Sequence, residues 1–284
     1  MLHNLYALIR RPLRKRNDRN TAEPGSRFRV EPLETRLAPV CNNSLAAGVL
    51  TINCNGANDL VNISDNDADP LGNITVNGVH FSAVSVVKVA AGSGNDTVNY
   101  TLTGNLTTPR TVNIALGNGQ DKATLDFDDD NPATRLAADS ALNIVVKGEN
   151  GTDAITAAFD LAINSKVKIA VDGGNANDQV TAAFDILLAE PDLIGPDTAD
   201  LDLALVGGNG TDKLTGNLTL AGGSTGDLKA VVNGNNGPDT LTLTVRGTTS
   251  GTIAASIDGG AGPDACTRTA NVTRKNCEID TLVV

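Results

Sequence analysis

Apolar and polar residues alternate over most of the chain after residue 49, in short stretches that are separated by glycine-rich turns. In one such stretch Leu201, Leu203 and Leu205 share one face, while Asp202 and Ala204 occupy the other. A period of two with one apolar face predicts β-strands that are buried on one side. The pattern therefore indicates an all-β protein built from half-buried strands and turns.

One kind of turn recurs between these strands. Its clearest copy runs from Gly207 to Thr215 and reads Gly-Gly-Asn-Gly-Thr-Asp-Lys-Leu-Thr. Glycine is expected here because the turn requires positive φ angles, and an aspartate can bond to the turn backbone. Degenerate copies of the same turn end at Asp59, Asp96, Asp121, Asp153, Asp178, Asp239 and Asp264.

The spacing of these turns indicates a repeat. With Asp212 included, successive aspartates are separated by 37, 25, 32, 25, 34, 27 and 25 residues. A constant minimum of 25 with a variable excess is typical of a repeat unit that carries loop insertions. Two of the excesses coincide with loop-like sequence at residues 128–132 and 189–197.

Two all-β architectures fit a strand–turn–strand repeat. In a parallel β-helix, or β-solenoid, each unit of about 25 residues forms one coil and equivalent strands pair in parallel, so that about eight coils stack. In an antiparallel β-sandwich or meander, the same turn is a hairpin loop. We favour the solenoid because the turn recurs once per two strands while the other connection varies in length. The glycine-rich turn is also longer than the two-residue turns that hairpins prefer.

Charge and proline content divide the chain into two parts. Residues 1–40 contain nine Lys or Arg, four acidic residues and four prolines, which predicts a basic tail without a fold of its own. Residues 41–284 are expected to form a single repeat domain with a net charge of −16, since the chain carries −11 and the tail +5. An acidic domain repels nucleic acids and anionic lipids and attracts divalent cations. No apolar stretch is long enough to span a membrane.

The four cysteines lie near the two ends of the repeat domain. Four cysteines allow three disulfide connectivities, and we favour the local pairs Cys41 with Cys54 and Cys266 with Cys277. The reason is that each end of a repeat array exposes an edge that needs closing. Disulfides would place the domain in an oxidising compartment. The alternative is four free thiols in a cytosolic protein.

The nonapeptide at Gly207 resembles the G-G-x-G-x-D-x-U-x repeat of RTX proteins, which binds calcium. The resemblance implies a calcium site built from aspartate carboxylates and glycine carbonyls, because Ca²⁺ takes six to eight oxygen ligands. In RTX proteins the nonapeptides follow one another directly, whereas here a long strand follows each copy. The alternative is a turn in which the aspartate caps its own loop and no metal is needed. The residues that the resemblance singles out as calcium ligands are Gly207, Gly208, Gly210, Asp212, Gly234, Gly237, Asp239, Gly259, Gly260, Gly262, Asp264, Asp178, Asp153, Asp121 and Asp96.

Two shorter resemblances concern the ends of the chain. Residues 28–39 are similar to the LEPR-XLL type of N-terminal signature, although Leu33 stands where the first arginine of that signature would fall. The segment from Asp264 to Glu278 resembles the closing segment of secreted RTX-like bacterial proteins, with a cysteine after the last turn and an Asn-Cys-Glu sequence that follows it. Both resemblances imply an exported protein that is extracellular or attached to the cell surface.

The sequence contains no recognisable catalytic arrangement. His3 and His80 stand alone, and neither a Gly-x-Ser-x-Gly nor a His-Glu-x-x-His motif occurs. We therefore expect an exported, non-enzymatic repeat protein that acts as a calcium-binding structural or adhesive module, with other surface proteins or matrix polysaccharide as partners. The alternative is a polysaccharide-active β-helix enzyme, a lyase or a hydrolase, which would need clustered charged groups on one strand face and usually aromatic platforms for sugar. With seven aromatic residues in the whole chain, such platforms are scarce.

Overall fold

A computed structural model describes residues 41–56, 58–66, 73–103, 106, 108–128, 135–136, 140–163, 165–188 and 199–284. The chain divides into the units Met1–Leu37 and Ala38–Val284, and all described residues belong to the second unit. The predicted basic tail (1–40), its signature at 28–39 and nearly all of both loop insertions lie outside the described residues.

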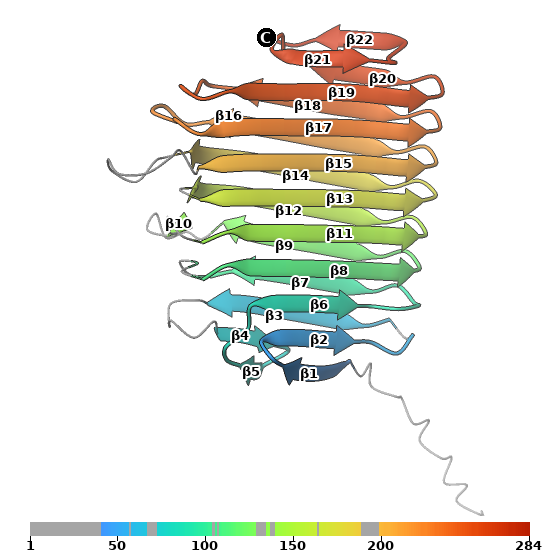
Figure 1. Ribbon diagram of the computed structural model, residues 1–284. Helices are drawn as coiled ribbons and strands as arrows, with labels where there is room; N and C mark the ends of the chain where they lie inside the picture. Colours follow the sequence, from blue (N-terminus) through green and yellow to red (C-terminus); the bar gives the residue numbers. More distant parts are fainter. Residues whose placement is uncertain are drawn as a thin grey trace, which may run out of the picture. The chain divides into compact units, whose positions relative to one another are not determined.

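The described residues of the unit Ala38–Val284 form two long β-sheets that face each other, with their strands stacked one above the next (Figure 1). The first sheet has ten strands in the described part of the chain, and its order follows the sequence. These strands are β1 (Asn42–Ala46), β2 (Val49–Asn53), β6 (Val86–Ala90), β8 (Arg110–Asn118), β11 (Leu142–Asn150), β13 (Lys166–Asn175), β15 (Asp200–Asn209), β17 (Asp227–Asn236), β19 (Ile253–Ala261) and β21 (Val272–Lys275).

The second sheet has twelve strands in the same described residues. From the C-terminal end these are β22 (Ile279–Leu282), β20 (Ala265–Arg268), β18 (Thr240–Arg246), β16 (Lys213–Leu220), β14 (Gln179–Leu188), β12 (Ala154–Ile163), β9 (Lys122–Asp128), β7 (Thr97–Leu102), β3 (Leu60–Asn66), β4 (Asn73–Val76) and β5 (Val79–Phe81), with β10 (Arg135–Leu136) beside β12.

The strands pair in the way that a solenoid requires. The chain crosses from the first sheet to the second through the glycine turn and returns through a connection of variable length. Equivalent strands of successive coils then pair in parallel, as β13 does with β15 and β14 with β16. Antiparallel pairs in the described residues occur only at the N-terminal end, where they are β1–β2, β3–β4 and β4–β5. The parallel β-solenoid predicted from the sequence is therefore confirmed, and the antiparallel alternative is wrong.

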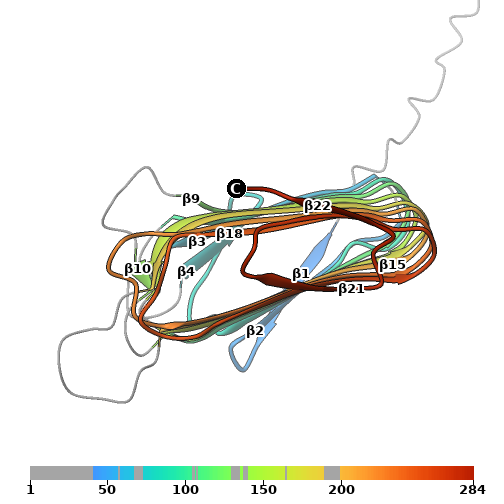
Figure 2. The same ribbon diagram turned by 90° about the horizontal axis from the view of Figure 1, so that it is seen from above.

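Seen along the stack, the coils superimpose as a flattened ring whose two long sides are the sheets (Figure 2). The alternating apolar residues point inward from both sides, and Leu201, Leu203 and Leu205 are all at most 1% exposed. Aliphatic side chains fill most of this narrow core. Phe127, Phe159 and Phe184 lie in register on neighbouring strands, with ring centroids 4.0 and 4.5 Å apart. A thin two-sided core explains how a chain with few aromatics can still bury its apolar residues.

One buried ion pair interrupts the core near its N-terminal end. The Arg110 Nε donates to Asp65 Oδ2 at 2.7 Å, and both side chains are fully buried. The Tyr100 hydroxyl donates to the same carboxylate oxygen at 2.5 Å. The sequence pattern did not predict this cluster of Asp65, Tyr100 and Arg110. The three residues are far apart in the chain and come from three different strands.

Candidate functional site

The recurring glycine turn forms one long corner of the solenoid. In its clearest copy, β15 ends at Asn209 and β16 begins at Lys213, so that the turn residues lie between the two sheets. The backbone has positive φ at Gly208 (109°) and Gly210 (147°). Copies that lack glycine at the position of Gly208 also adopt positive φ, as at Glu149 and Asn235 (both 72°). The turn geometry therefore persists where the motif is degenerate.

Space as well as conformation demands glycine in this turn. A Cβ atom on Gly210 would lie 1.8 Å from the carbonyl oxygen of Ala176 in the preceding coil. A Cβ atom on Gly207 would lie 2.5 Å from Oδ2 of Asp212, in the same turn. In this copy the first glycine is needed because the aspartate carboxylate packs against its Cα, whereas Ala91 and Leu116 occupy this position in the copies that end at Asp96 and Asp121.

The aspartates of successive turns form a column that we call the aspartate ladder. In each pair of coils, the backbone N–H of one ladder aspartate donates to Oδ1 of the aspartate in the next coil, at 2.7 to 2.9 Å. All members are at most 3% exposed. The ladder consists of Asp59, Asp96, Asp121, Asp153, Asp178, Asp212, Asp239 and Asp264.

The ladder differs from the self-capped turn considered as an alternative to calcium. In that alternative each aspartate bonds within its own turn, whereas Oδ1 accepts a hydrogen bond from the neighbouring coil. For example, the Asp178 N–H donates to Asp212 Oδ1 at 2.8 Å, across 34 residues of sequence. The carboxylates therefore connect coils, which a single turn taken alone does not reveal.

The second carboxylate oxygen has a different environment. Oδ2 is buried without a hydrogen-bond partner in every ladder aspartate, and Asp59, at the N-terminal end, lacks a partner for both oxygens. Desolvation is the main cause that raises the pKa of Asp178 from 3.8 to about 7, and that of Asp153 and Asp239 to about 6. The donated N–H opposes this rise, and the neighbouring ladder carboxylates add to it by charge repulsion. The ladder is thus a row of acidic groups whose charge is incompletely compensated.

The donor set of this corner fits calcium. A Cβ atom added to Gly207 would lie 2.5 Å from Asp212 Oδ2 and 2.8 Å from the Gly234 carbonyl oxygen. Both oxygens therefore lie beside the Cα of Gly207. An unpartnered carboxylate oxygen and a glycine carbonyl of the next coil are both hard oxygen donors, which Ca²⁺ prefers. The same pair of donors recurs beside Gly234, where a Cβ would lie 2.3 Å from Asp239 Oδ2 and 2.4 Å from the Gly259 carbonyl.

The structure gathers the sequence-predicted ligand residues along this one corner. The four predicted aspartates outside the three best copies of the motif, and the three within these copies, all belong to the ladder. The third glycines of the three best copies lie against one another in neighbouring coils, since a Cβ on Gly237 would lie 1.6 Å from the Gly210 carbonyl oxygen and a Cβ on Gly262 would lie 2.2 Å from that of Gly237. The sequence therefore located the corner, and the tertiary structure aligned its copies.

A second ladder at this corner, made of asparagines, was not predicted from the sequence. The asparagine at the third position of the turn donates through Nδ2 to Oδ1 of its counterpart one coil before, at 2.8 to 2.9 Å. A signal was present, since five successive copies carry asparagine at that position. This asparagine ladder is Asn118, Asn150, Asn175, Asn209 and Asn236.

Each end of the solenoid carries one disulfide. Cys41 is bonded to Cys54, and Cys266 to Cys277, which is the local pairing. Next to the second disulfide, Glu278 Oε2 accepts the Asp264 N–H at 2.6 Å and so takes the place of the next ladder carboxylate. The Asn-Cys-Glu segment therefore ends the aspartate ladder with an acid from outside the repeat.

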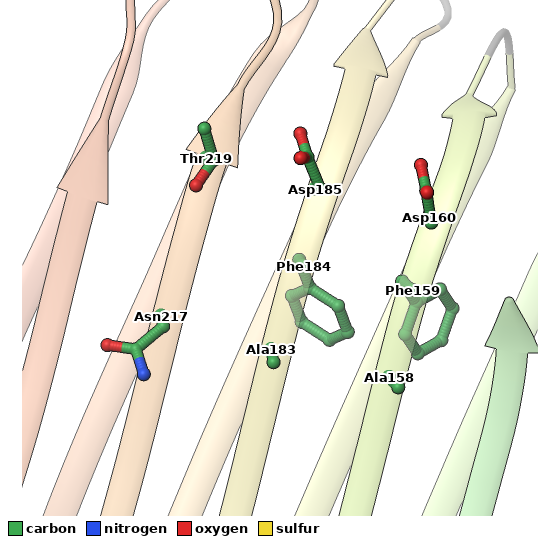
Figure 3. Close-up of a pocket in the computed structure, with 8 residues that line it drawn as sticks. All are labelled: Ala158, Phe159, Asp160, Ala183, Phe184, Asp185, Asn217 and Thr219. Atoms are coloured by element: carbon green, nitrogen blue, oxygen red, sulfur yellow. The ribbon is translucent and has the colours of Figure 1, made fainter.

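A shallow groove on the outer face of the second sheet is a separate candidate site. Ala158 and Ala183 form its floor, and the exposed carboxylates of Asp160 and Asp185 stand side by side along it (Figure 3). Phe159 and Phe184, which also line it, are at most 3% exposed and belong to the core, so they offer little ring surface to a ligand. His80 lies exposed on β5, at the end of the stack.

Comparison with known proteins adds no further constraint. No protein-family model, no curated protein and no solved structure matches the chain. Across the described residues, we find no helix of the length and apolarity needed to cross a membrane.

Proposed function

We propose that the chain is an exported, non-enzymatic solenoid that serves as a structural or adhesive module at the cell surface or in the extracellular matrix, with calcium bound along the aspartate ladder. Its partners would be other surface proteins or matrix polysaccharide. Each element of this proposal rests on a separate feature of the molecule.

The observation that carries the calcium proposal is the row of unpartnered Oδ2 atoms. Leaving a buried carboxylate oxygen without a partner is costly, and a column of such groups about 4.8 Å apart repels itself. A divalent cation at the corner would compensate this charge and bind adjacent coils together. Calcium ions bound along the ladder would then hold successive coils of the solenoid together.

Export and a non-catalytic role have their own support. One disulfide lies at each end of the solenoid, and such bonds persist in oxidising compartments. The regular lateral faces of a solenoid provide an extended surface for binding, as in other repeat proteins. Cell fractionation with thiol alkylation tests this part: we expect the protein outside the cytosol with all four cysteines protected from alkylation. Reduced protein in the cytosol would contradict export.

Thermal unfolding with and without calcium tests the metal. We expect the melting temperature in millimolar CaCl₂ to exceed that in EDTA, because an ion that binds only the folded state stabilises it. The variant Asp212→Asn should lose part of this increase, since it removes one ladder charge. The matched control Asp185→Asn changes an exposed aspartate on the outer face and should show the full increase in melting temperature. An identical melting temperature in calcium and EDTA would refute calcium binding.

A polysaccharide-active enzyme is the second candidate, favoured only by the paired carboxylates of Asp160 and Asp185 in the groove. Glycoside hydrolases use two carboxyl groups that flank the scissile bond. Incubation with a panel of anionic and neutral polysaccharides, followed by assay of reducing ends and unsaturated products, distinguishes the two proposals. Product that disappears in Asp160→Asn would support the enzyme, and no product with any substrate would exclude it for that panel.

A further inference from the structure

The large apolar side chains that are exposed in the described residues lie at the two ends of the stack of coils. At the N-terminal end these are Leu45 on β1, Leu60 on β3 and Val79 on β5, which are 40%, 50% and 53% exposed. At the C-terminal end they are Ile279 and Leu282 on β22, at 64% and 57%, together with Val284. In the described residues, no other strand carries a large exposed apolar side chain.

Three of these side chains, Leu45, Val79 and Leu282, occupy core positions according to the register of their strands. Leu45 is paired directly with Leu50, and Val79 with Val76, and both of these partners are fully buried. Residues that are directly opposite in adjacent strands project to the same face of the sheet. Leu45 and Val79 are therefore the outermost layer of the core in the described part of the chain, and no further described coil covers them.

The C-terminal end has the corresponding feature. Leu282 is in register with Arg268, which is itself in register with the buried Leu243 one coil earlier. Leu282 thus occupies a core column and remains more than half exposed only because the stack ends there. Solenoids that remain monomeric usually cover such ends with a polar capping repeat.

The backbone is also open at both ends. In the described part of the chain, β1 and β21 terminate the first sheet, and β5 and β22 terminate the second, each with one hydrogen-bonded neighbour. Unpaired strand edges are templates for pairing with another chain. Each end of the unit therefore offers two strand edges (Figure 1). The exposed core residues lie on these strands.

We propose that this unit associates head to tail with further copies of the same chain, so that the C-terminal end of one copy stacks on the N-terminal end of the next. Leu282 of one copy would then be covered by Leu45 and Val79 of its neighbour. The contact would extend the core of the solenoid from one molecule into the next.

Strand direction permits this stacking. β5 runs in the same direction as β3, because two antiparallel pairings separate them, and β3 is parallel to the strands that follow it in the second sheet. A β22 edge placed on the β5 edge of the next copy would therefore continue the parallel sheet. β1 is antiparallel to β2, so it would meet β21 as an antiparallel pair.

The register of the second sheet favours contact between unlike ends. Leu282 at one end and Val79 at the other belong to the same column of core positions, because the pairings from β22 to β5 connect them strand by strand. A copy stacked head to tail would therefore continue this column. Because the two surfaces differ, the contact is heterologous and gives open-ended chains of molecules.

Sedimentation equilibrium of the full chain over a range of concentrations, in EDTA, tests this proposal independently of calcium. We expect the weight-average mass to rise continuously beyond that of a dimer. Leu282→Lys and Val79→Lys each place a charge on one end and should weaken association about tenfold or more, since each removes the burial of one apolar side chain. Thr240→Lys adds the same charge to an exposed position on the lateral face and should leave association unchanged.

Mixing the two end variants distinguishes the orientation of the contact. Val79→Lys keeps its C-terminal end and Leu282→Lys keeps its N-terminal end, so an equimolar mixture should form dimers and stop there. Both substituted side chains are more than half exposed, and circular dichroism spectra should show that both variants remain folded. A chain that stays monomeric at all concentrations, as it would if its own N-terminal residues covered the end, overturns the proposal. Dimers of Val79→Lys alone that form as readily as those of the native chain would also overturn it, because they would point to contact between two C-terminal ends.

Discussion

The aspartate ladder predicts that the protein loses stability as the pH rises, which is the reverse of the usual behaviour of carboxylates. The pKa of Asp178 is raised from 3.8 to about 7 in the folded chain, mainly by desolvation. Between these two values the folded state binds more protons than the unfolded state, so the free energy of unfolding falls with pH. The contribution of Asp178 is fully present below pH 4 and is lost as the pH passes 7.

The size of this effect follows from the shift. A difference of about three pKa units corresponds to roughly 4 kcal/mol, and screening by water at the corner reduces this to about 2 kcal/mol. For a domain of this size, about 2 kcal/mol should lower the melting temperature by roughly 4 to 8 °C between pH 4 and pH 8. Asp153 and Asp239, whose pKa values are raised to about 6, act in the same direction.

Asp178→Asn isolates the contribution of one ladder residue. The asparagine keeps an Oδ1 that can accept the Asp153 N–H, which is bonded at 2.8 Å in the native chain, but it carries no charge at any pH. In EDTA we expect the variant to match the native protein at pH 4 and to be about 2 kcal/mol more stable at pH 8. Asp185→Asn, on the exposed face of the same sheet, is the control and should leave the pH dependence unchanged.

Urea unfolding monitored by circular dichroism at pH 4, 6 and 8 provides the measurement. The reasoning is refuted if the native protein in EDTA is equally stable at pH 4 and pH 8, or more stable at pH 8. It is also refuted if Asp178→Asn is the less stable protein at pH 8, because the buried charge would then be favourable. Added calcium should restore stability mainly at the higher pH, where the carboxylates are ionised.

Further predictions concern the turn, the core and the corner. Gly210→Ala should prevent cooperative folding or cost more than about 3 kcal/mol, because its Cβ would lie 1.8 Å from a backbone oxygen, whereas Gly222→Ala meets no atom within 4 Å and should be nearly neutral in thermal melts. Arg110→Leu leaves a buried carboxylate without its ion pair and should cost about 3 to 5 kcal/mol in urea unfolding, against less than about 1 kcal/mol for Lys229→Ala at an exposed pair. Asn209→Ala removes two ladder hydrogen bonds and should cost about 1 to 2 kcal/mol, and an unchanged melting temperature would show that the asparagine ladder contributes nothing.

The candidate site was only partly predictable from the sequence. The positions of the ladder aspartates could be read from the repeat, because each turn carries its own glycines and its own Asp. The hydrogen bonds between Asp178 and Asp212, or between Asn209 and Asn236, could not be read, because they connect residues of different coils. The residue that ends the ladder, Glu278, lies outside the repeat and gave no periodic signal.

The sequence by itself determined the strands and the corner, because alternation and glycine placement act within a few residues of the chain. It also determined the repeat length of about 25 residues, and with it the preference for a solenoid. Only the tertiary structure decided the environment of the aspartates, since burial and pKa depend on the coils above and below. It likewise decided which apolar residues remain uncovered. Leu45 and Leu282 are in register with core positions of the adjacent strand, and they differ from the core leucines because no described strand covers their other side.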